Sequence, residues 1–268
     1  STPSGTLRHA VNHTGEKIED GWVIQPDTVH LIEDYNIPRA VKHAVSDATD
    51  VPIIQHLYTS PDEQAEQWFE QQMGRISHFA EKQNIAVQAW TAFGMDGVIW
   101  LTGVEGAVIM AMEEPIAFGR LVDIIAETDF GRTKLACDHP SIDIVVQRGW
   151  YSSTDFWSPD LFDEYVIPHV RELAQLTHKH GKKFGYVITT GVNILGERLA
   201  DAGVDILYFV DPVQDTISLE FARDNLSDKM TIAGGINTVS LSTSDNMTIQ
   251  NEIESALTVL GPTNRFIL

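Results

Sequence analysis

Hydrophobic residues in the middle of the chain switch between two spacings, one typical of buried strands and one typical of helices. Residues 142–147 and 184–188 are short apolar runs of the kind expected for strands. The segment between them carries apolar residues at helical spacing, namely Phe162, Val166, Val170, Leu173 and Leu176. Ser158-Pro159-Asp160 is a strong helix start, since serine caps free N–H groups and proline fits the first helical position. The pattern predicts two parallel strands joined by one long helix, which Pro168 should bend.

The same alternation of strand and helix patterns continues to the end of the chain. Strand patterns cover residues 204–210, 230–233 and 265–268, and helix patterns cover residues 194–202, 217–225 and 247–260. The first half predicts helices over residues 37–45, 60–82 and 114–127, short buried helices over 95–112, a strand over 85–90 and a β-ribbon around 22–24. The alternation predicts a parallel α/β sheet, and this many repeats favour a (β/α)8 TIM-type barrel over an open doubly wound sheet. We expect a single barrel domain over residues 1–268.

The barrel prediction also locates the active site, because enzymes with this fold bind and convert their substrates where the strands end and the following loops begin. The predicted strand ends carry polar side chains, namely Thr91, Gln147, Thr189, Thr190, Asn193, Asp211 and Asn237. We expect these side chains to converge on one mouth, where Thr189, Thr190, Asn193 and Asn237 bind substrate. The alternative for the two threonines and Asn193 is capping of the next helix.

The loop after residue 147 is dense in aromatic and hydroxyl groups. Trp150 can stack on a flat ligand such as a corrin, a pterin or an aromatic ether, and Arg148 is a further substrate-binding candidate. Tyr151 can donate a proton if its hydroxyl reaches the cleft. The alternative is an aromatic lid packed on the barrel.

Two carboxylates join Tyr151 as catalytic candidates. Asp211 follows a buried strand, a place where burial can suit a carboxyl group to proton transfer. Its alternative role is to cap the turn before Pro212. Glu105 lies in a glycine-rich apolar segment, where a carboxylate needs a partner or a functional site.

Composition narrows the class of function. The formal charge of −20 argues against unaided binding to nucleic acid or to an anionic membrane, although solubility or adaptation to salt is the simpler reason for it. A single cysteine, Cys137, excludes an internal disulfide and a Cys-rich zinc site. Asp138, His139 and Asp143 offer a metal constellation, but turn chemistry explains them better, so we expect no metal site. The chain has no apolar run long enough to span a membrane and no signal-peptide pattern at residues 1–5, so we expect a cytoplasmic protein.

Short motifs spread over most of the chain are informative through their order and spacing. They are Thr2-Pro3-Ser4-Gly5, Gly103-Val104-Glu105-Gly106, Ser158-Pro159-Asp160-Leu161-Phe162 with Pro168, the strand between Gly181 and Gly191, Gly234-Gly235-Ile236-Asn237 and Arg265-Phe266-Ile267-Leu268. In this order they resemble the uroporphyrinogen decarboxylase superfamily, which contains the decarboxylase and the cobalamin-linked methyltransferases. The resemblance implies a distorted (β/α)8 barrel, shortened at both ends, with a deep cleft for a tetrapyrrole or a methyl-group carrier.

The departures from the superfamily pattern bear on the reaction. Its zinc-dependent methyltransferases carry a His-x-Cys-Gly motif where this chain has Ile188-Thr189-Thr190-Gly191. Isoleucine and threonine cannot replace imidazole and thiolate as zinc ligands, so the resemblance implies a member without that zinc site. The arginine-rich motif and key aspartate of the decarboxylase would lie N-terminal to the first residue of this chain.

We therefore expect a zinc-independent methyltransferase that demethylates a small substrate or passes a methyl group to an acceptor, with a corrinoid (cobalamin) on a partner protein. Asp211, Glu105 or Tyr151 would protonate the leaving group. The first alternative is decarboxylation of uroporphyrinogen III in tetrapyrrole biosynthesis, for which the candidate arginines are Arg8, Arg39, Arg120 and Arg148. The second is a non-catalytic barrel that docks a carrier protein. A homodimer is compatible with each of these three functions.

Overall fold

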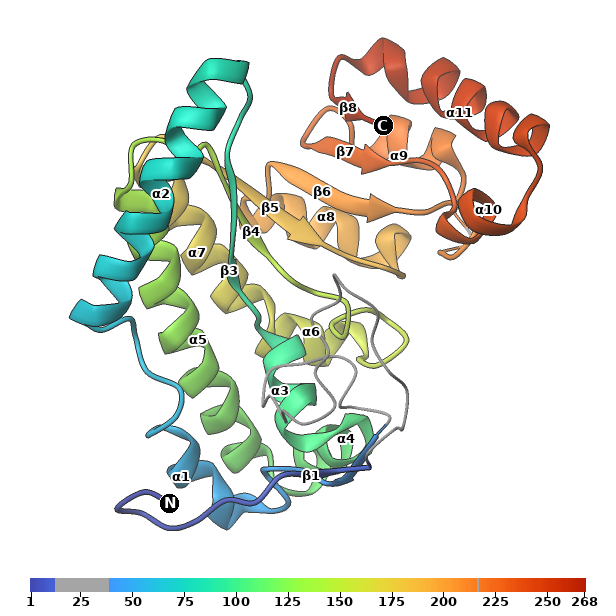
Figure 1. The fold of residues 1–268 in the computed structure, drawn as a ribbon. Coiled ribbons are helices and arrows are strands. Elements are labelled where there is room, and N and C mark those ends of the chain that lie inside the picture. Colours follow the sequence, from blue (N-terminus) through green and yellow to red (C-terminus); the bar gives the residue numbers. More distant parts are fainter. Residues whose placement is uncertain (13–38, 216) are drawn as a thin grey trace. The chain divides into compact units, whose positions relative to one another are not determined.

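The computed structural model describes residues 1–12, 39–215 and 217–268 (Figure 1). These residues divide into two compact units. Unit 1 is Ser1–Ser60 with Gly94–Thr128, and unit 2 is Pro61–Phe93 with Asp129–Leu268. The β-ribbon predicted around residues 22–24 lies outside the described residues.

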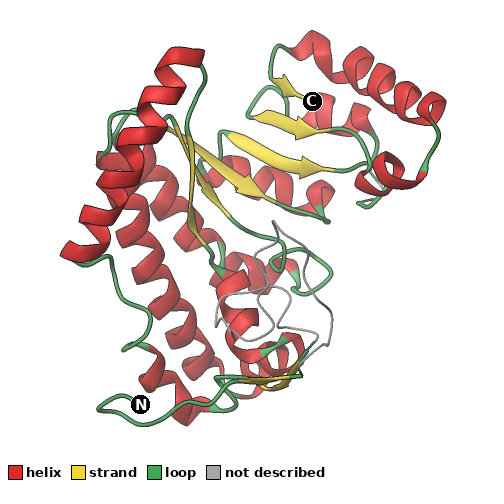
Figure 2. Cartoon of the chain, viewed as in Figure 1, coloured by secondary structure: helices red, strands yellow, loops and turns green. Residues whose placement is uncertain are grey.

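Unit 2 is built on a parallel sheet, whose strands are yellow in Figure 2. The strands follow one another in sequence order. The strands are β3 (Gln88–Ala92), β4 (Ile144–Gln147), β5 (Lys183–Val187), β6 (Ile206–Val210), β7 (Thr231–Gly234) and β8 (Phe266–Ile267). No strand is skipped, which is the winding of a barrel, whereas a doubly wound sheet reverses its strand order. The predicted α/β class and parallel sheet are confirmed. Within the described residues β8 does not pair with β3, so the sheet is open and a closed barrel is not observed.

Helices connect the strands of unit 2 close to the predicted positions. They are α6 (Pro159–Tyr165), α7 (Ile167–Lys179), α8 (Val192–Ala202), α9 (Leu219–Asn225), α10 (Thr238–Thr243) and α11 (Asn246–Leu260), followed by the 3-10 turn η3 (Gly261–Thr263). Ser158 caps α6 as predicted, because its Oγ accepts a hydrogen bond from the Leu161 N–H at 3.3 Å. The bend predicted at Pro168 is a full break at Val166, and the proline lies in the first turn of α7, where its missing N–H costs nothing.

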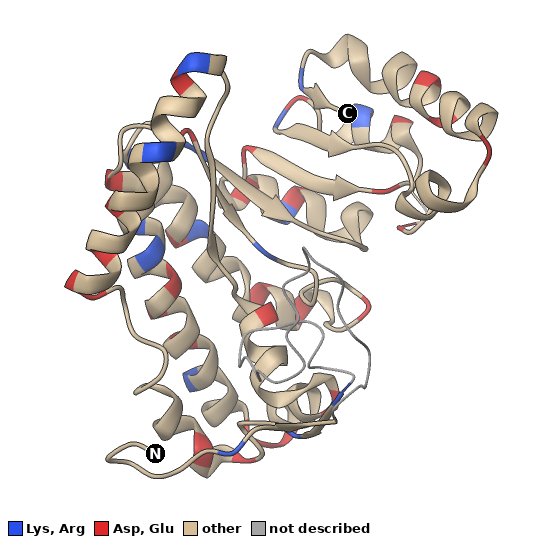
Figure 3. Cartoon of the chain, in the orientation of Figure 1, with Lys and Arg blue, Asp and Glu red and all other residues tan. Residues whose placement is uncertain are grey.

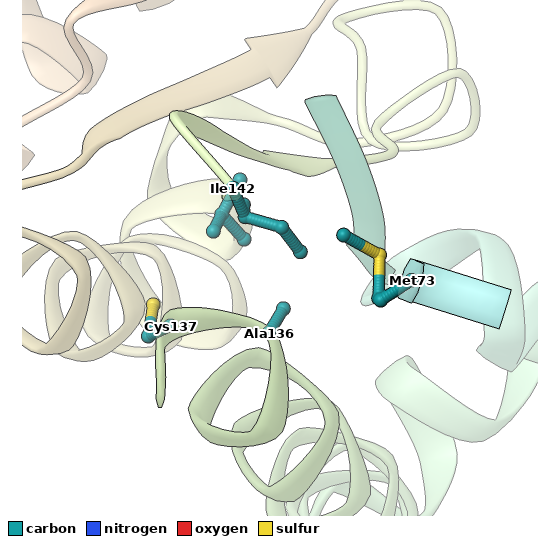
Figure 4. Close-up of a cluster of buried hydrophobic side chains, with 5 residues drawn as sticks. Met73, Ala136, Cys137 and Ile142 are labelled. Carbon is teal, nitrogen blue, oxygen red and sulfur yellow. The ribbon is translucent and has the colours of Figure 1, made fainter. Parts of the chain in front are cut away.

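A hydrophobic cluster joins the sheet of unit 2 to two long helices (Figure 4). α2 (Glu63–Gln83) contributes Met73, the last turn of α5 (Pro115–Asp138) contributes Ala136 and Cys137, and Ile142 and Val145 come from β4 and the residues before it. All five side chains are almost fully buried. Burial also raises the pKa of the Cys137 thiol, which fits a packing role for this cysteine.

Unit 1 combines a short antiparallel ribbon with helices. The ribbon pairs β1 (Ala10–Val11) with β2 (Ala40–Lys42), and the helices are η2 (Ala48–Asp50), α1 (Val51–Ile54), α3 (Met95–Thr102), α4 (Val104–Glu113) and the part of α5 up to Thr128. Two short helices over residues 95–112 are therefore confirmed, but only α3 is buried, since Val108, Ile109 and Met112 of α4 are exposed. The helix predicted over residues 37–45 is wrong where the structure describes it, because residues 40–42 pair with β1 instead.

Gly103 separates α3 from α4 and has φ +72°, and a Cβ at this position would collide with the His43 ring. Among the described residues no single helix is long and apolar enough to cross a membrane. Taken together, α3 and α4 reach that length and composition, but the pair is bent by 103°.

Charged residues of both signs are distributed over the helices and loops (Figure 3). Acidic residues outnumber basic ones by 38 to 18 over the whole chain, which gives the formal charge of −20. A bound anion would therefore need local positive charge, whereas a cation would be drawn to the molecule.

Candidate functional site

The backbone at the carboxyl end of β6 is distorted in a way that redirects an aromatic side chain. The pairing of β6 with β7 shifts register between Tyr208 and Val210, and the residue between them, Phe209, has φ +64°. A bulky side chain at positive φ is a genuine outlier that costs about 1–3 kcal/mol. On the neighbouring strand only glycine fits at position 234, since a Cβ there would lie 2.5 Å from the Val210 carbonyl oxygen.

Phe209 takes part in an aromatic cluster, which consists of Trp90, Trp150 and Phe209. The rings of Trp90 and Trp150 are stacked, with centroids 5.6 Å apart and planes 24° apart, and Phe209 lies 5.5 Å from Trp150. The Arg148 guanidinium lies over the Trp150 ring, 4.3 Å from its centroid. Trp90 and Phe209 keep 40% and 46% of their surface exposed, so the cluster presents open aromatic surface. The structure thus brings Arg148 and Trp150 together.

Tyr151, the neighbour of Trp150, is held inside its own loop. Its ring meets Phe156 edge to face at 5.6 Å, and its carbonyl oxygen accepts a hydrogen bond from Trp157 Nε1 at 2.7 Å. Both contacts lie within the loop that joins β4 to α6. A role in proton transfer for this hydroxyl stays a prediction.

Asp211 and Asn237 meet at the carboxyl ends of β6 and β7. Asp211 is 6% exposed, and its Oδ2 accepts a hydrogen bond from Asn237 Nδ2 at 2.7 Å. Its Oδ1 accepts hydrogen bonds from the backbone N–H groups of Val213 and Gln214, so it also caps the turn that follows. The Asn237 Oδ1 caps α10 by accepting from the Ser240 N–H at 3.0 Å. Asp211 and Asn237 can therefore cap the turn and the helix that follow and also take part in a functional site.

Asp215, which the sequence analysis did not single out, lies beside them. Its carboxylate accepts hydrogen bonds from the backbone N–H groups of Gly191 and Val192 at the start of α8. Burial raises the pKa of the Asp215 carboxyl, the two backbone donors lower it, and the charges of Asp155 and Asp211 raise it. We call Asp155, Asp211 and Asp215 the carboxylate cluster. A carboxyl five residues beyond a predicted strand end was the only sequence signal for Asp215.

The two threonines at the end of β5 connect the loop after β4 to this cluster. The Thr190 hydroxyl donates a hydrogen bond to Asp155 Oδ2 at 2.7 Å. The Thr189 hydroxyl reaches the Trp150 carbonyl oxygen at 3.4 Å. Asn193 follows in the first turn of α8 and is exposed. Both threonine hydroxyls are thus engaged with the loop that carries the aromatic residues.

Glu105, the remaining catalytic candidate, belongs to unit 1. It lies in the first turn of α4 and lines a pocket of about 690 Å³ together with Lys42, His43 and Thr102. The pocket is formed entirely by residues of unit 1, from β2 and the junction of α3 with α4. The structure describes Glu105 within its own unit, and its catalytic role stays a prediction.

The residues considered for metal binding have other partners. Asp138 pairs with Lys134 at 2.6 Å and with His180 Nε2 at 3.1 Å, and Asp143 Oδ2 accepts a hydrogen bond from the Val87 N–H. Within residues 1–12, 39–215 and 217–268, no three His, Cys, Asp or Glu side chains are arranged to hold a metal ion. Ile188, at the position of the superfamily's zinc-binding histidine, is fully buried.

Comparisons with known proteins place the chain in a family. Among solved structures, a methyltransferase from Methanosarcina mazei superposes with a TM-score of 0.55 at 15% sequence identity, over 85% of this chain and 58% of that chain. A "putative fructose-1,6-biphosphate aldolase" from Coccidioides immitis gives a TM-score of only 0.30 at 11% identity, over 70% of this chain and 80% of that one, which is too low to support an argument.

The similarity to the Methanosarcina mazei methyltransferase supports the fold alone, and this chain spans little more than half the length of that protein. A search of curated proteins found no match. The model of the family described as "Uroporphyrinogen decarboxylase (URO-D)" matches residues 100–268, more than half of the chain. The chain belongs to the uroporphyrinogen decarboxylase (URO-D) family.

Proposed function

We propose that this chain is a methyltransferase that moves a methyl group between a small methylated substrate and a corrinoid carried by a partner protein. The loop after β4 and the end of β6 each carry residues of both the aromatic and the carboxylate cluster, and this is the observation that carries the proposal. Family membership and the fold of a protein named as a methyltransferase support it as well. The proposal includes a closed eight-stranded barrel as a single domain over residues 1–268, which the sequential strand order supports. A cytoplasmic location and a homodimer stay predictions.

The residues of unit 2 suit the handling of a flat or methyl-bearing ligand. Exposed faces of Trp90 and Phe209 offer apolar stacking surface, which fits a corrin ring or a small aromatic substrate. Thr189, Thr190 and Asn237 are the proposed substrate-binding groups, and they contact the Trp150 carbonyl oxygen, Asp155 and Asp211 respectively. A bound corrinoid would supply the nucleophile that accepts the methyl group.

Proton transfer is needed when the methyl donor is neutral, because an ether or amine leaving group then takes up a proton. Asp211, Glu105 and Tyr151 are the proposed donors. Asp215 joins them because burial raises its pKa, so it keeps its proton at a higher pH than an ordinary aspartate. The reaction needs no zinc at the end of β5, in keeping with Ile188 and Thr190 there.

Decarboxylation of a tetrapyrrole with eight carboxylates has less support. Arg148, the candidate arginine in unit 2, is already stacked on Trp150. In unit 1, Arg39 donates to the Asn12 carbonyl oxygen and Arg120 pairs with Glu127 at 2.9 Å. We therefore do not propose this reaction.

A spectroscopic assay tests the proposal. The full chain is mixed with a reduced corrinoid and a panel of methylated donors, and methyl transfer is followed by the change in the corrin absorption spectrum. We expect Trp150→Leu to lower the rate about tenfold, the effect of losing roughly 1.4 kcal/mol of binding. Trp68→Leu is the matched control, because Trp68 is 64% exposed on α2 and belongs to neither cluster.

Three results would contradict the proposal. The first is an unchanged spectrum with every donor and acceptor, from protein whose circular dichroism shows it to be folded. The second is release of carbon dioxide from a porphyrinogen, which would favour decarboxylation. The third is binding of a corrinoid protein without turnover, which would favour a barrel that only docks a carrier.

A further inference from the structure

We infer that the aromatic and carboxylate clusters of unit 2 together bind a methyl-bearing cation, a quaternary ammonium or sulfonium group. The inference rests on the proposed methyl transfer and names the chemical class of its donor. It combines three observations: the open aromatic faces, the excess of negative charge beside them and a cation already seated on one of the rings.

The aromatic faces are suited to a soft cation. A cation within about 6 Å of a ring centroid is attracted by the electrons of the ring face, most strongly for tryptophan. The cluster already shows this contact, since the Arg148 guanidinium lies 4.3 Å from the Trp150 centroid. Trp90 and Phe209 flank Trp150 and are 40% and 46% exposed, so further aromatic surface is open beside that contact.

The charge beside the rings decides between a cation and an anion. Asp211 follows Phe209 by two residues, and Asp155 and Asp211 both act electrostatically on Asp215. Asp155 lies in the same loop as Trp150, and the end of β5 contacts this loop twice, through Thr190 to Asp155 and through Thr189 to the Trp150 carbonyl oxygen. Against the carboxylates of Asp155 and Asp211 the aromatic cluster holds one arginine, and the chain as a whole carries −20. The local and the overall field therefore both favour a positively charged ligand.

An onium donor also fits the absence of zinc ligands at the end of β5. The bond between the methyl carbon and the positive nitrogen or sulfur breaks, and its electron pair stays on that atom. The methyl carbon forms its new bond with an electron pair of the reduced corrinoid acceptor. The leaving group departs as a neutral tertiary amine or thioether, so the donor side needs neither a proton nor a metal. In this case the carboxylates hold the donor by charge.

A pair of probes with equal shape and different charge tests the inference. Choline and its uncharged isostere 3,3-dimethylbutan-1-ol are titrated separately into the full chain by calorimetry. We expect choline to bind about 3- to 30-fold more tightly, the ratio that one or two cation–π contacts provide. Trp90→Leu should abolish most of this ratio, whereas the matched control Trp68→Leu on α2 should leave it unchanged.

Arg148→Gln tests the sign of the ligand's charge. Removal of the guanidinium takes one positive charge from the aromatic cluster and frees the face of Trp150 that the guanidinium covers. Choline should therefore bind more tightly to this variant. Weaker binding of choline by Arg148→Gln would overturn the inference, as would equal affinity for the two probes. Circular dichroism of each variant verifies that it is folded, and Phe209→Leu replaces Trp90→Leu if that variant is not.

The outcomes separate this inference from the proposed function. Methyl transfer from a neutral ether, with no preference for choline over its isostere, would overturn the inference and leave the proposed function standing. Preferential binding of choline without any change in a corrin spectrum would support the cation site and contradict the proposed methyl transfer.

Discussion

At the scale of single residues, Phe209 stands out among the described residues, because a bulky side chain rarely adopts its positive φ. Its φ of +64° breaks the regular pairing of β6 with β7 and places the ring 5.5 Å from Trp150. Such strain is retained where the surrounding structure fixes it, and it concentrates at binding and catalytic sites. The strain and the ring contact together mark Phe209 as part of the candidate site.

The strain predicts an inverted order of stability for two substitutions of Phe209. In an ordinary strand glycine is worse than leucine, because glycine loses more backbone entropy on folding. Here both variants lose the ring contact, worth about 0.5–1.5 kcal/mol, but only Phe209→Gly also relieves about 1–2 kcal/mol of strain. We expect the free energy of unfolding of Phe209→Gly, measured with urea, to equal or exceed that of Phe209→Leu. A clearly less stable glycine variant would mean that position 209 is not strained.

At the scale of elements, local chemistry predicted the helices best where a cap or a proline marks the boundary. Ser158, Pro159 and Pro168 define the start of α6 and its break from α7, because capping and the missing N–H act within one turn. The three-residue strand β2 could not be predicted from its own pattern, since its partner β1 lies about thirty residues earlier. The sequence pattern did not predict helix α10, because Gly234 and Gly235 lie just before its cap, Asn237, and indicate a turn.

The cap of α6 gives a quantitative prediction. Ser158→Ala removes the acceptor for the Leu161 N–H and should lower the free energy of unfolding by about 1 kcal/mol. Ser158→Asp keeps an acceptor and adds negative charge at the positive end of the helix, so it should retain the stability of the native protein. Urea unfolding of both variants measures the difference. Equal losses in the alanine and aspartate variants would show that the cap contributes nothing.

At the scale of the whole molecule, sequence order predicted which residues gather but not what each of them contacts. Carboxyl ends of sequential parallel strands meet at one edge, which brought Trp150, Thr190, Asp211 and Asn237 to the same end of the unit 2 sheet. Asp215 was missed because its partners, the N–H groups of Gly191 and Val192, lie more than twenty residues away. Glu105 falls in unit 1, a division that hydrophobic patterning does not reveal.

The stability of the whole molecule should fall on mild acidification, and unit 1 supplies a physical reason. His9 and His43 lie with ring centroids 6.1 Å apart, and among the described residues the buried His9 nitrogens and His43 Nδ1 have no hydrogen-bond partner. Burial lowers the pKa of both histidines below 6.5, and the charge of His43 lowers that of His9 further. Lys42 and Glu105 are the charged groups that line the same pocket as His43.

The sign of the effect follows from proton binding. Each histidine has a lower pKa in the folded protein than the value of 6.5 in the unfolded chain. Between these two pKa values the unfolded chain binds more protons than the folded protein does. The stability that the neutral histidines allow is therefore fully present above pH 6.5 and is lost as the pH falls below 6.5. Asp215 acts in the opposite direction, because its raised pKa makes its ionisation costly to the folded protein above an ordinary aspartate pKa of 3.8.

We expect the urea midpoint of the native protein to drop between about pH 7.5 and about pH 5.5, and the His9→Gln, His43→Gln double variant to show a smaller drop. His56→Gln is the matched control, since His56 is an exposed histidine of unit 1 that contacts Ser4 and not this pair. An equal drop in the native protein and the double variant would place the acid sensitivity elsewhere. Asp215→Asn should make the midpoint fall more steeply as the pH approaches the ordinary aspartate pKa of 3.8, because it removes the group whose protonation favours the folded state on acidification.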